Sequence, residues 1–188
     1  MKSASGGARQ AVFLDRDGVL IRTHVRDGKP YAVTDAQDVA IIDGVKNACE
    51  SLAHAGFLLV MVTNQPDVAR GLTPRRFVEE VNARLVAALH LDSVRVCYHD
   101  DRDNCDCRKP KPGLIIGATE DFSIELRRSV MVGDRWRDIE AGRRAGCLTV
   151  LVGDGYDEAM PHPPDHVAAS LADAVPWIRT SLATAEGC

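Results

Sequence analysis

The chain has no excess of basic residues, no apolar run of membrane length and no internal repeat or low-complexity tract. A net charge of -4 and a pI near 5.8 give no general attraction to nucleic acid or to an anionic membrane. The longest apolar runs, such as residues 57–62, have the length of a strand, and residues 1–7 lack the apolar core of a secretion signal. These absences predict a cytoplasmic protein with neither a nucleic-acid nor a membrane partner.

The composition that remains is that of a globular domain. With 188 residues, 45% hydrophobic and 27% charged, the chain can bury a full core. We expect a disordered tail at residues 1–9 and a single domain at residues 10–188. Strands are expected at residues 11–14, 57–62, 93–96, 129–132, 148–152 and 166–168, and helices at residues 43–55, 73–89, 112–121, 136–145 and 171–182. Strands that alternate with helices predict an α/β fold with a parallel, doubly wound sheet.

Two aspartates directly follow the first expected strand. Asp15 and Asp17 stand two residues apart, and Gly18 then lets the chain turn away. Because carboxylates this close repel each other, we expect a bound cation, a raised pKa on one of them, or both. The alternative for this short pattern alone is a turn in which the aspartates accept hydrogen bonds from the backbone.

Polar residues also end two further strands. Thr63 and Asn64 follow the second strand, Asp134 follows the fourth, and the basic pair Arg108 and Lys109 precedes a helix. In an open α/β sheet the carboxyl ends of the strands share one edge, so these groups should converge. Carboxylates suit Mg²⁺, and the basic, hydroxyl and amide groups suit a phosphate. The pattern predicts phosphoryl chemistry.

Four segments resemble, in order, the four motifs of the haloacid dehalogenase-like (HAD) phosphohydrolases. They are residues 15–20 (DRDGVL), 62–64 (VTN), 108–110 (RKP) and 132–138 (VGDRWRD). The resemblance implies a Rossmann-like HAD core, Mg²⁺ as catalytic cofactor and a phosphorylated small-molecule substrate. With residues 22–38 expected to form a small flap, no large cap domain is predicted, and this favours a monomer with an open site.

The same resemblance assigns roles to the strand-end residues. Asp15 would be the nucleophile that forms an aspartyl phosphate, and Asp17 the general acid and base, its pKa raised by a neighbouring carboxylate and phosphate. Asp134, with Asp15 and the main-chain carbonyl of Asp17, would bind Mg²⁺. Thr63, Asn64 and Lys109 would contact the transferred phosphoryl group.

Three further residues have alternative interpretations. Asp138, four residues after Asp134, either supports the metal site or caps the helix that begins there. Arg108 either binds substrate, which we favour, or pairs with the acidic residues 100–103. In an extended backbone Arg16 points to the side opposite its neighbouring aspartates, which predicts a surface role.

A cysteine-rich loop at residues 97–108 predicts a second metal site. Cys97, His99, Cys105 and Cys107 offer three thiolates and one imidazole, a complete tetrahedral set for a structural Zn²⁺ with no open position for water. A chance cluster of free thiols is the alternative. Zinc would hold Arg108 and Lys109 at the mouth of the site.

Within the superfamily, residues 63–65 (TNQ), 69–71 (ARG), 97–107 and 108–113 (RKPKPG) resemble the D,D-heptose 1,7-bisphosphate phosphatases. This favours a 7-phosphatase acting on D-glycero-D-manno-heptose 1,7-bisphosphate. The histidinol-phosphate phosphatases, which have a similar zinc loop, are the alternative, and Pro66-Asp67 and the short loop at residues 100–104 depart from the heptose pattern. A non-catalytic, zinc-stapled phosphate-binding module is disfavoured, because every expected catalytic residue is present.

Charges near the expected substrate do not decide between the two phosphatases. Arg70, Arg108 and Lys111 suit a second phosphate on the substrate, since each charge-assisted contact to a phosphate is stronger than a neutral one. The acidic residues Asp100, Asp101 and Asp103 would suit the amine of histidinol phosphate, or they are simply solvated.

Overall fold

The computed structural model describes residues 8–26, 29–31, 39–153 and 155–183. Most of the predicted tail, residues 1–7, and part of the predicted flap, residues 27–28 and 32–38, lie outside them. Arg9, assigned to the tail from the sequence, forms an isolated bridge with Ile124.

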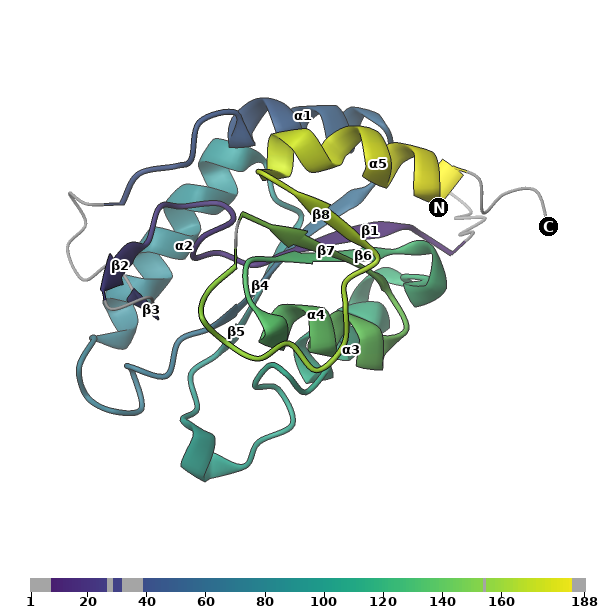
Figure 1. Ribbon diagram of the computed structural model, residues 1–188. Coiled ribbons are helices and arrows are strands. Elements are labelled where there is room, and N and C mark those ends of the chain that lie inside the picture. Colours follow the sequence, from purple (N-terminus) through teal and green to yellow (C-terminus); the bar gives the residue numbers. More distant parts are fainter. Residues whose placement is uncertain (1–7, 27–28, 32–38, 154, 184–188) are drawn as a thin grey trace, which may run out of the picture.

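A six-stranded parallel sheet forms the centre of the molecule, in the order β5-β4-β1-β6-β7-β8 (Figure 1). Its strands are β1 (Ala11–Leu14), β4 (Leu58–Asn64), β5 (Ser93–Cys97), β6 (Val130–Gly133), β7 (Leu148–Val152) and β8 (His166–Ala168). The chain runs from β1 to β4 and β5 on one side of β1, and it then adds β6, β7 and β8 on the other side. The strand order therefore reverses at β1. The predicted doubly wound α/β fold is confirmed.

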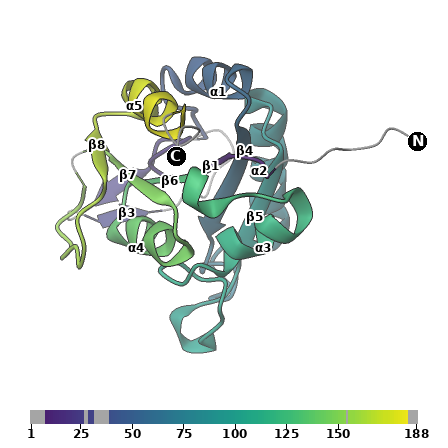
Figure 2. The same cartoon turned by 90° about the vertical axis from the view of Figure 1, so that its right-hand side faces the viewer.

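Helices cover both faces of the sheet (Figure 2). One face carries α1 (Val45–His54), α2 (Arg75–Leu89) and α5 (Leu171–Ala183), and the other carries α3 (Gly113–Phe122) and α4 (Trp136–Ala145). Alternate residues of β1 pack to opposite sides, Val12 and Leu14 under the first group and Ala11 and Phe13 under the second. This double burial explains the uninterrupted apolar runs.

Two details differ from the sequence prediction. Strand β4 continues two residues beyond the predicted end, because Thr63 and Asn64 pair with Val96 and Cys97 of β5. Part of the predicted flap forms a two-stranded antiparallel hairpin of β2 (His24–Arg26) and β3 (Lys29–Tyr31). Two short 3-10 helices, Asp101–Asp103 and Leu126–Arg128, complete the elements. No large cap domain occurs within the described residues.

Candidate active site

A pocket of about 460 Å³ opens at the carboxyl edge of β1, β4 and β6. It is lined by all nine residues that the sequence predicted for the Mg²⁺ and phosphate site: Asp15, Asp17, Thr63, Asn64, Arg70, Arg108, Lys109, Asp134 and Asp138. The segments that carry them are far apart in the sequence, and the sheet brings them together. This is the reversal point at which open α/β sheets bind ligands.

A buried ammonium connects two of the carboxylates. Lys109 Nζ lies 2.6 Å from Asp15 Oδ1 and 2.6 Å from Asp138 Oδ1, and it donates to the carbonyl of Val62 at 2.8 Å. Burial opposes the charge on Lys109, but the attraction of Asp138 and Asp15 outweighs it and raises the pKa of the ammonium. Asp138 also accepts a hydrogen bond from the Arg135 backbone at the start of α4. The two alternatives for Asp138, support of the site and helix capping, are therefore compatible.

Asp134 has one carboxylate oxygen without a partner. Its Oδ2 accepts a hydrogen bond from the Tyr156 hydroxyl at 2.6 Å, whereas its buried Oδ1 has no hydrogen-bond partner among the residues that the structure describes. Gly18, at a φ of +85°, passes so close that a Cβ there would lie 1.9 Å from Asp134 Oδ2. Burial, together with Asp15 and Asp138, raises the pKa of Asp134 well above its usual range.

These carboxylates fit a divalent cation. Asp15, Asp134 and Asp138 each offer an oxygen, and these oxygens lie within 4.8 Å of one another. Among the described residues, one ammonium, that of Lys109, contacts two of these carboxylates. A buried carboxylate oxygen without a partner costs free energy unless something binds it. Mg²⁺, which prefers a few carboxylates and retains water, suits this set.

The buried position of Asp15 predicts a pH dependence of stability. Burial and the neighbouring Asp138 and Asp17, only partly offset by Lys109, raise the pKa of Asp15 to about 7 from 3.8. The folded state binds the Asp15 proton more tightly than the unfolded state does. The protonated carboxyl therefore contributes its full stabilisation below about pH 4, and this contribution is lost as the pH rises through 7. In Mg²⁺-free protein we expect a slope that approaches about 1.4 kcal/mol per pH unit for this one proton.

Urea unfolding between pH 5 and pH 8, with and without Mg²⁺, measures this slope. Because Mg²⁺ binds the ionised carboxylate, the stabilisation that it gives should grow with pH. A free energy of unfolding that is independent of pH in the Mg²⁺-free protein would contradict the prediction.

Asp17 is held by an arginine whose predicted position was wrong. Arg16 is only 2% exposed, and it donates to both carboxylate oxygens of Asp17 at 3.0 Å and to Asn82 of α2 at 3.2 Å. The guanidinium lies between Asp17 and α2, so the side chain neither points away from both aspartates nor reaches the surface. Gln65 adds a third hydrogen bond to Asp17, at 2.8 Å.

Thr63 and Asn64 lie at the end of β4 and face the pocket. The amide of Gln65 donates to Thr63 Oγ1 at 2.9 Å. Asn64 donates to the carbonyl of Lys109 at 3.0 Å and accepts from its backbone N–H at 3.1 Å. Asn64 therefore fixes the Lys109 main chain, and one of its two side-chain N–H donors is left for a ligand.

Arginines on the pocket rim are paired with acidic residues. Arg108 donates to Asp101 at 2.8 and 3.3 Å, and Arg137 lies 3.6 Å from the same carboxylate. Arg70 contacts Asp100 at 2.6 Å and holds the pKa of that carboxyl down at about 2. The acidic loop residues Asp100 and Asp101 are therefore not simply solvated.

Lys111 lies away from this pocket. Its ammonium contacts Asn104 at 3.0 Å and Asp106 at 3.3 Å, and it does not line the pocket. Of the three cations considered from the sequence for a second phosphate, the structure places Arg70 and Arg108 there and not Lys111.

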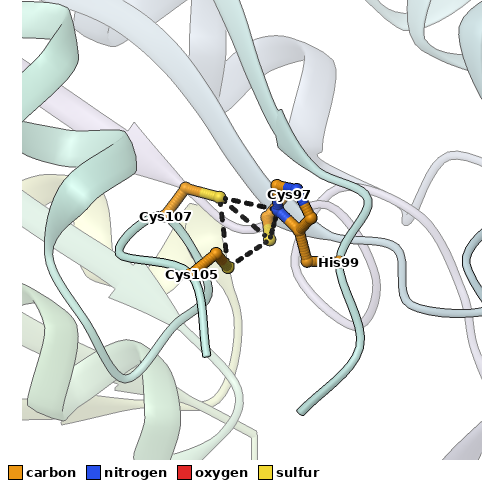
Figure 3. Close-up of side chains that lie close together, drawn as sticks. All are labelled: Cys97, His99, Cys105 and Cys107. Carbon is orange, nitrogen blue, oxygen red and sulfur yellow. Dashed lines mark hydrogen bonds between the residues drawn. The ribbon is translucent and has the colours of Figure 1, made fainter. Parts of the chain in front are cut away.

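The four predicted zinc ligands converge at the end of β5 (Figure 3). Their ligand atoms lie within 4.8 Å of one another, and the sulfurs of Cys97, Cys105 and Cys107 are 3.2 to 3.7 Å apart. The Nδ1 atom of His99 lies 3.2 Å from the sulfur of Cys107. Tetrahedral zinc with Zn–S bonds of about 2.3 Å separates its sulfurs by roughly 3.7 Å, so the cluster fits this ion.

Sequence reasoning missed several residues near the site: Arg16, Gln65, Arg135, Arg137 and Tyr156. Gln65 and Arg137 stand beside predicted site residues, and the polar run at the end of β4 was a signal for the first. Tyr156 lies 22 positions after Asp134, and we see no sequence signal for that contact.

The fold and the arrangement of carboxylates and lysine at the strand ends define a HAD-like hydrolase, and residues 106–174 match the family model described as HAD-hydrolase-like. The chain is 35% identical to the D-glycero-beta-D-manno-heptose-1,7-bisphosphate 7-phosphatase of Haemophilus ducreyi, over 90% of this chain and 98% of that protein. It is 38% identical to the protein of the same name from Vibrio cholerae, over 79% of this chain and 83% of that one.

A solved structure agrees with these relatives. The D,D-heptose 1,7-bisphosphate phosphatase of B. bronchiseptica, complexed with magnesium and phosphate, has a TM-score of 0.78 and 27% identity, over 92% of this chain and 99% of that one. The chain belongs to the D-glycero-D-manno-heptose 1,7-bisphosphate 7-phosphatase family, as the resemblance predicted. None of the helices formed by the described residues is long and apolar enough to cross a membrane.

Proposed function

We propose that this protein is an Mg²⁺-dependent phosphomonoesterase that removes the 7-phosphate of D-glycero-D-manno-heptose 1,7-bisphosphate through an aspartyl-phosphate intermediate. The observation that carries this proposal is a buried charged group at the end of β1, which consists of Asp15, Lys109, Asp134 and Asp138. In this buried group Asp15 contacts Lys109 at 2.6 Å and lies beside the unpartnered oxygen of Asp134. Asp15, Asp134 and the main-chain carbonyl of Asp17 would hold Mg²⁺, which when bound keeps Asp15 ionised and offsets phosphoryl charge.

Five residues of the pocket then have roles in the reaction. Asp15 attacks phosphorus as the bond to the sugar oxygen breaks, and Asp17 gives that oxygen a proton. Asp17 next takes a proton from water, which hydrolyses the aspartyl phosphate and frees Asp15. Lys109, Thr63 and the free N–H of Asn64 would stabilise the charge on the phosphoryl oxygens in the transition state.

The charges on the rim favour a substrate with a second phosphate. Beyond the buried group and Asp17, the charged residues that line the pocket are four arginines and two aspartates: Arg70, Arg108, Arg135, Arg137, Asp67 and Asp101. Two of these arginines share the single carboxylate of Asp101. Because Asp100 and Asp101 already have arginine partners, they are poor candidates for binding the amine of histidinol phosphate.

Phosphate release from the two substrates tests this proposal. We expect kcat/KM for the heptose bisphosphate to exceed that for histidinol phosphate by at least about tenfold, which is roughly 1.4 kcal/mol of transition-state binding. Arg137→Ala should raise KM for the bisphosphate and spare a sugar monophosphate, and Arg179→Ala, an exposed change on α5, is the matched control. Equal or reversed values of kcat/KM would favour histidinol-phosphate phosphatase.

We also propose that Cys97, His99, Cys105 and Cys107 hold one structural Zn²⁺. The loop that they would close leads directly into Arg108 and Lys109, and Arg108 lines the same pocket as the buried group. We expect about one zinc per chain in protein purified without added metal, distinct from the exchangeable Mg²⁺, as measured by elemental analysis. Active, reduced protein with a zinc content near zero would contradict this.

The cellular setting and the state of assembly follow from the same proposal. Zinc binding by three cysteines requires them in the reduced state, as thiolates, and the cytoplasm keeps cysteines reduced, so we place the reaction there. We expect a monomer, because the pocket lining of this single chain already supplies every predicted catalytic residue.

A further inference from the structure

The segment at residues 155–165, which leads from β7 to β8, packs against the metal side of the pocket. We call it the β7–β8 segment. Tyr156 donates to Asp134, Glu158 pairs with Arg135, and His162 lies 2.9 Å from Glu140 of α4. Asp165 accepts hydrogen bonds from the backbone and hydroxyl of Thr149 at 2.8 Å. Polar contacts thus hold the segment at four places, and only the first reaches a predicted metal ligand.

The hydrogen bond from Tyr156 makes the two oxygens of Asp134 different. The phenol occupies Oδ2 at 2.6 Å, whereas Oδ1 is buried without a partner. Rotation about the Cβ–Cγ bond that tilts the carboxylate out of its present plane would break the hydrogen bond, whereas a half-turn only exchanges two equivalent oxygens. The phenol therefore fixes the plane of the carboxylate, in which one oxygen is held and the other is left for a cation.

We propose that Tyr156 is a positioning residue that orients Asp134 for Mg²⁺ binding. The inference rests on the proposed function, since it assumes that Asp134 is a metal ligand. Groups that hydrogen-bond to metal ligands fix their orientation, and their loss typically weakens metal affinity by about 10- to 100-fold. Tyr156 does not itself line the pocket, but its side chain also contacts Thr23 and Arg135, which do. Of the three contacts, the one with Asp134 reaches a predicted metal ligand.

The test is direct measurement of Mg²⁺ binding by titration calorimetry, without substrate. In Tyr156→Phe, which removes only the hydroxyl, we expect the Kd for Mg²⁺ to rise about tenfold or more. Activity should then need more Mg²⁺ for its half-maximal value, with kcat at saturating Mg²⁺ within about threefold of wild type. His162→Asn, which disturbs the same segment through Glu140, is the control and should leave Mg²⁺ affinity unchanged.

An unchanged Mg²⁺ affinity in Tyr156→Phe would overturn the proposal, as would an equal loss in His162→Asn, because that points to the segment as a whole. If the phenylalanine variant cannot be purified, Tyr156→Gln, which keeps a donor, is compared with Tyr156→Met, and equal affinities overturn the proposal. Binding is measured without turnover, so failure of the enzyme to hydrolyse the bisphosphate would reject the proposed substrate and leave this inference standing.

Discussion

Asp15→Asn should reduce phosphate release by at least about a thousandfold while the protein remains folded. The amide lacks both the charge and the nucleophilic oxygen pair needed to form the aspartyl phosphate, and none of the described residues beside it replaces it, since Asp138 is bound by Lys109 and the backbone of α4. Burial raises the pKa of Asp15 to about 7, so its ionised form is unfavourable without metal. The Asn variant should therefore be at least as stable as wild type at pH 8 in the absence of Mg²⁺.

This combination of lost activity and retained stability separates a chemical role from a structural one. Rates are measured by phosphate release under saturating substrate and Mg²⁺, and stability by thermal unfolding of the Mg²⁺-free protein. Asp43→Asn is the matched control, because Asp43 is exposed and, among the residues that the structure describes, pairs with exposed Arg22. If Asp15→Asn retained more than a tenth of wild-type activity, Asp15 would not be the nucleophile.

The positions of the residues predicted to be catalytic could be inferred from the sequence because their side chains follow buried strands. Asp15, Thr63 and Asp134 each end an apolar run, and parallel strands in adjacent places bring their carboxyl ends together. Both faces of each strand are buried, and this fixes how neighbouring strands align along their length. The convergence of the strand ends could therefore be predicted without any known distance between them. The cluster of four predicted zinc ligands was predictable for a simpler reason, since they lie within eleven consecutive residues, 97–107.

The partners of those residues were not predictable, because they come from elements that pack across the sheet. Arg16 was expected to point away from both aspartates, but it binds Asp17, and the tertiary position of α2 covers the guanidinium and brings Asn82 to it. Tyr156 depends in the same way on the path of the β7–β8 segment. Local spacing carries no information about such contacts.

The rim charges show the same limit. From the sequence, Arg70, Arg108 and Lys111 were equivalent cations beside an acidic loop. The structure directs Lys111 to Asn104 and Asp106, and it brings in Arg137 from α4 to share Asp101 with Arg108. The folded conformation of the loop decides which cations face the substrate. The number of charges in the sequence does not give this information.

Lys109→Met should be the second most damaging change, in both activity and stability. Met has a similar length but no charge, so Asp15 and Asp138 would be left buried without the ammonium that lies 2.6 Å from each. Removing one partner of a buried ion pair costs about 3–5 kcal/mol, because the remaining charge is uncompensated. We expect a loss of this size in the Mg²⁺-free protein at pH 8, measured by urea unfolding, and a fall in kcat/KM of at least about a hundredfold.

Two comparisons make this prediction specific to the position of the charge. Lys109→Arg keeps the charge, but a planar guanidinium does not fit a buried site in which one ammonium contacts Asp15, Asp138 and the Val62 carbonyl, so it should not restore activity. Added Mg²⁺ should recover part of the lost stability in Lys109→Met, because it supplies positive charge to the same carboxylates, but not the lost rate. A Lys109→Met protein as stable as wild type without Mg²⁺ would show that the ammonium does not compensate these carboxylates.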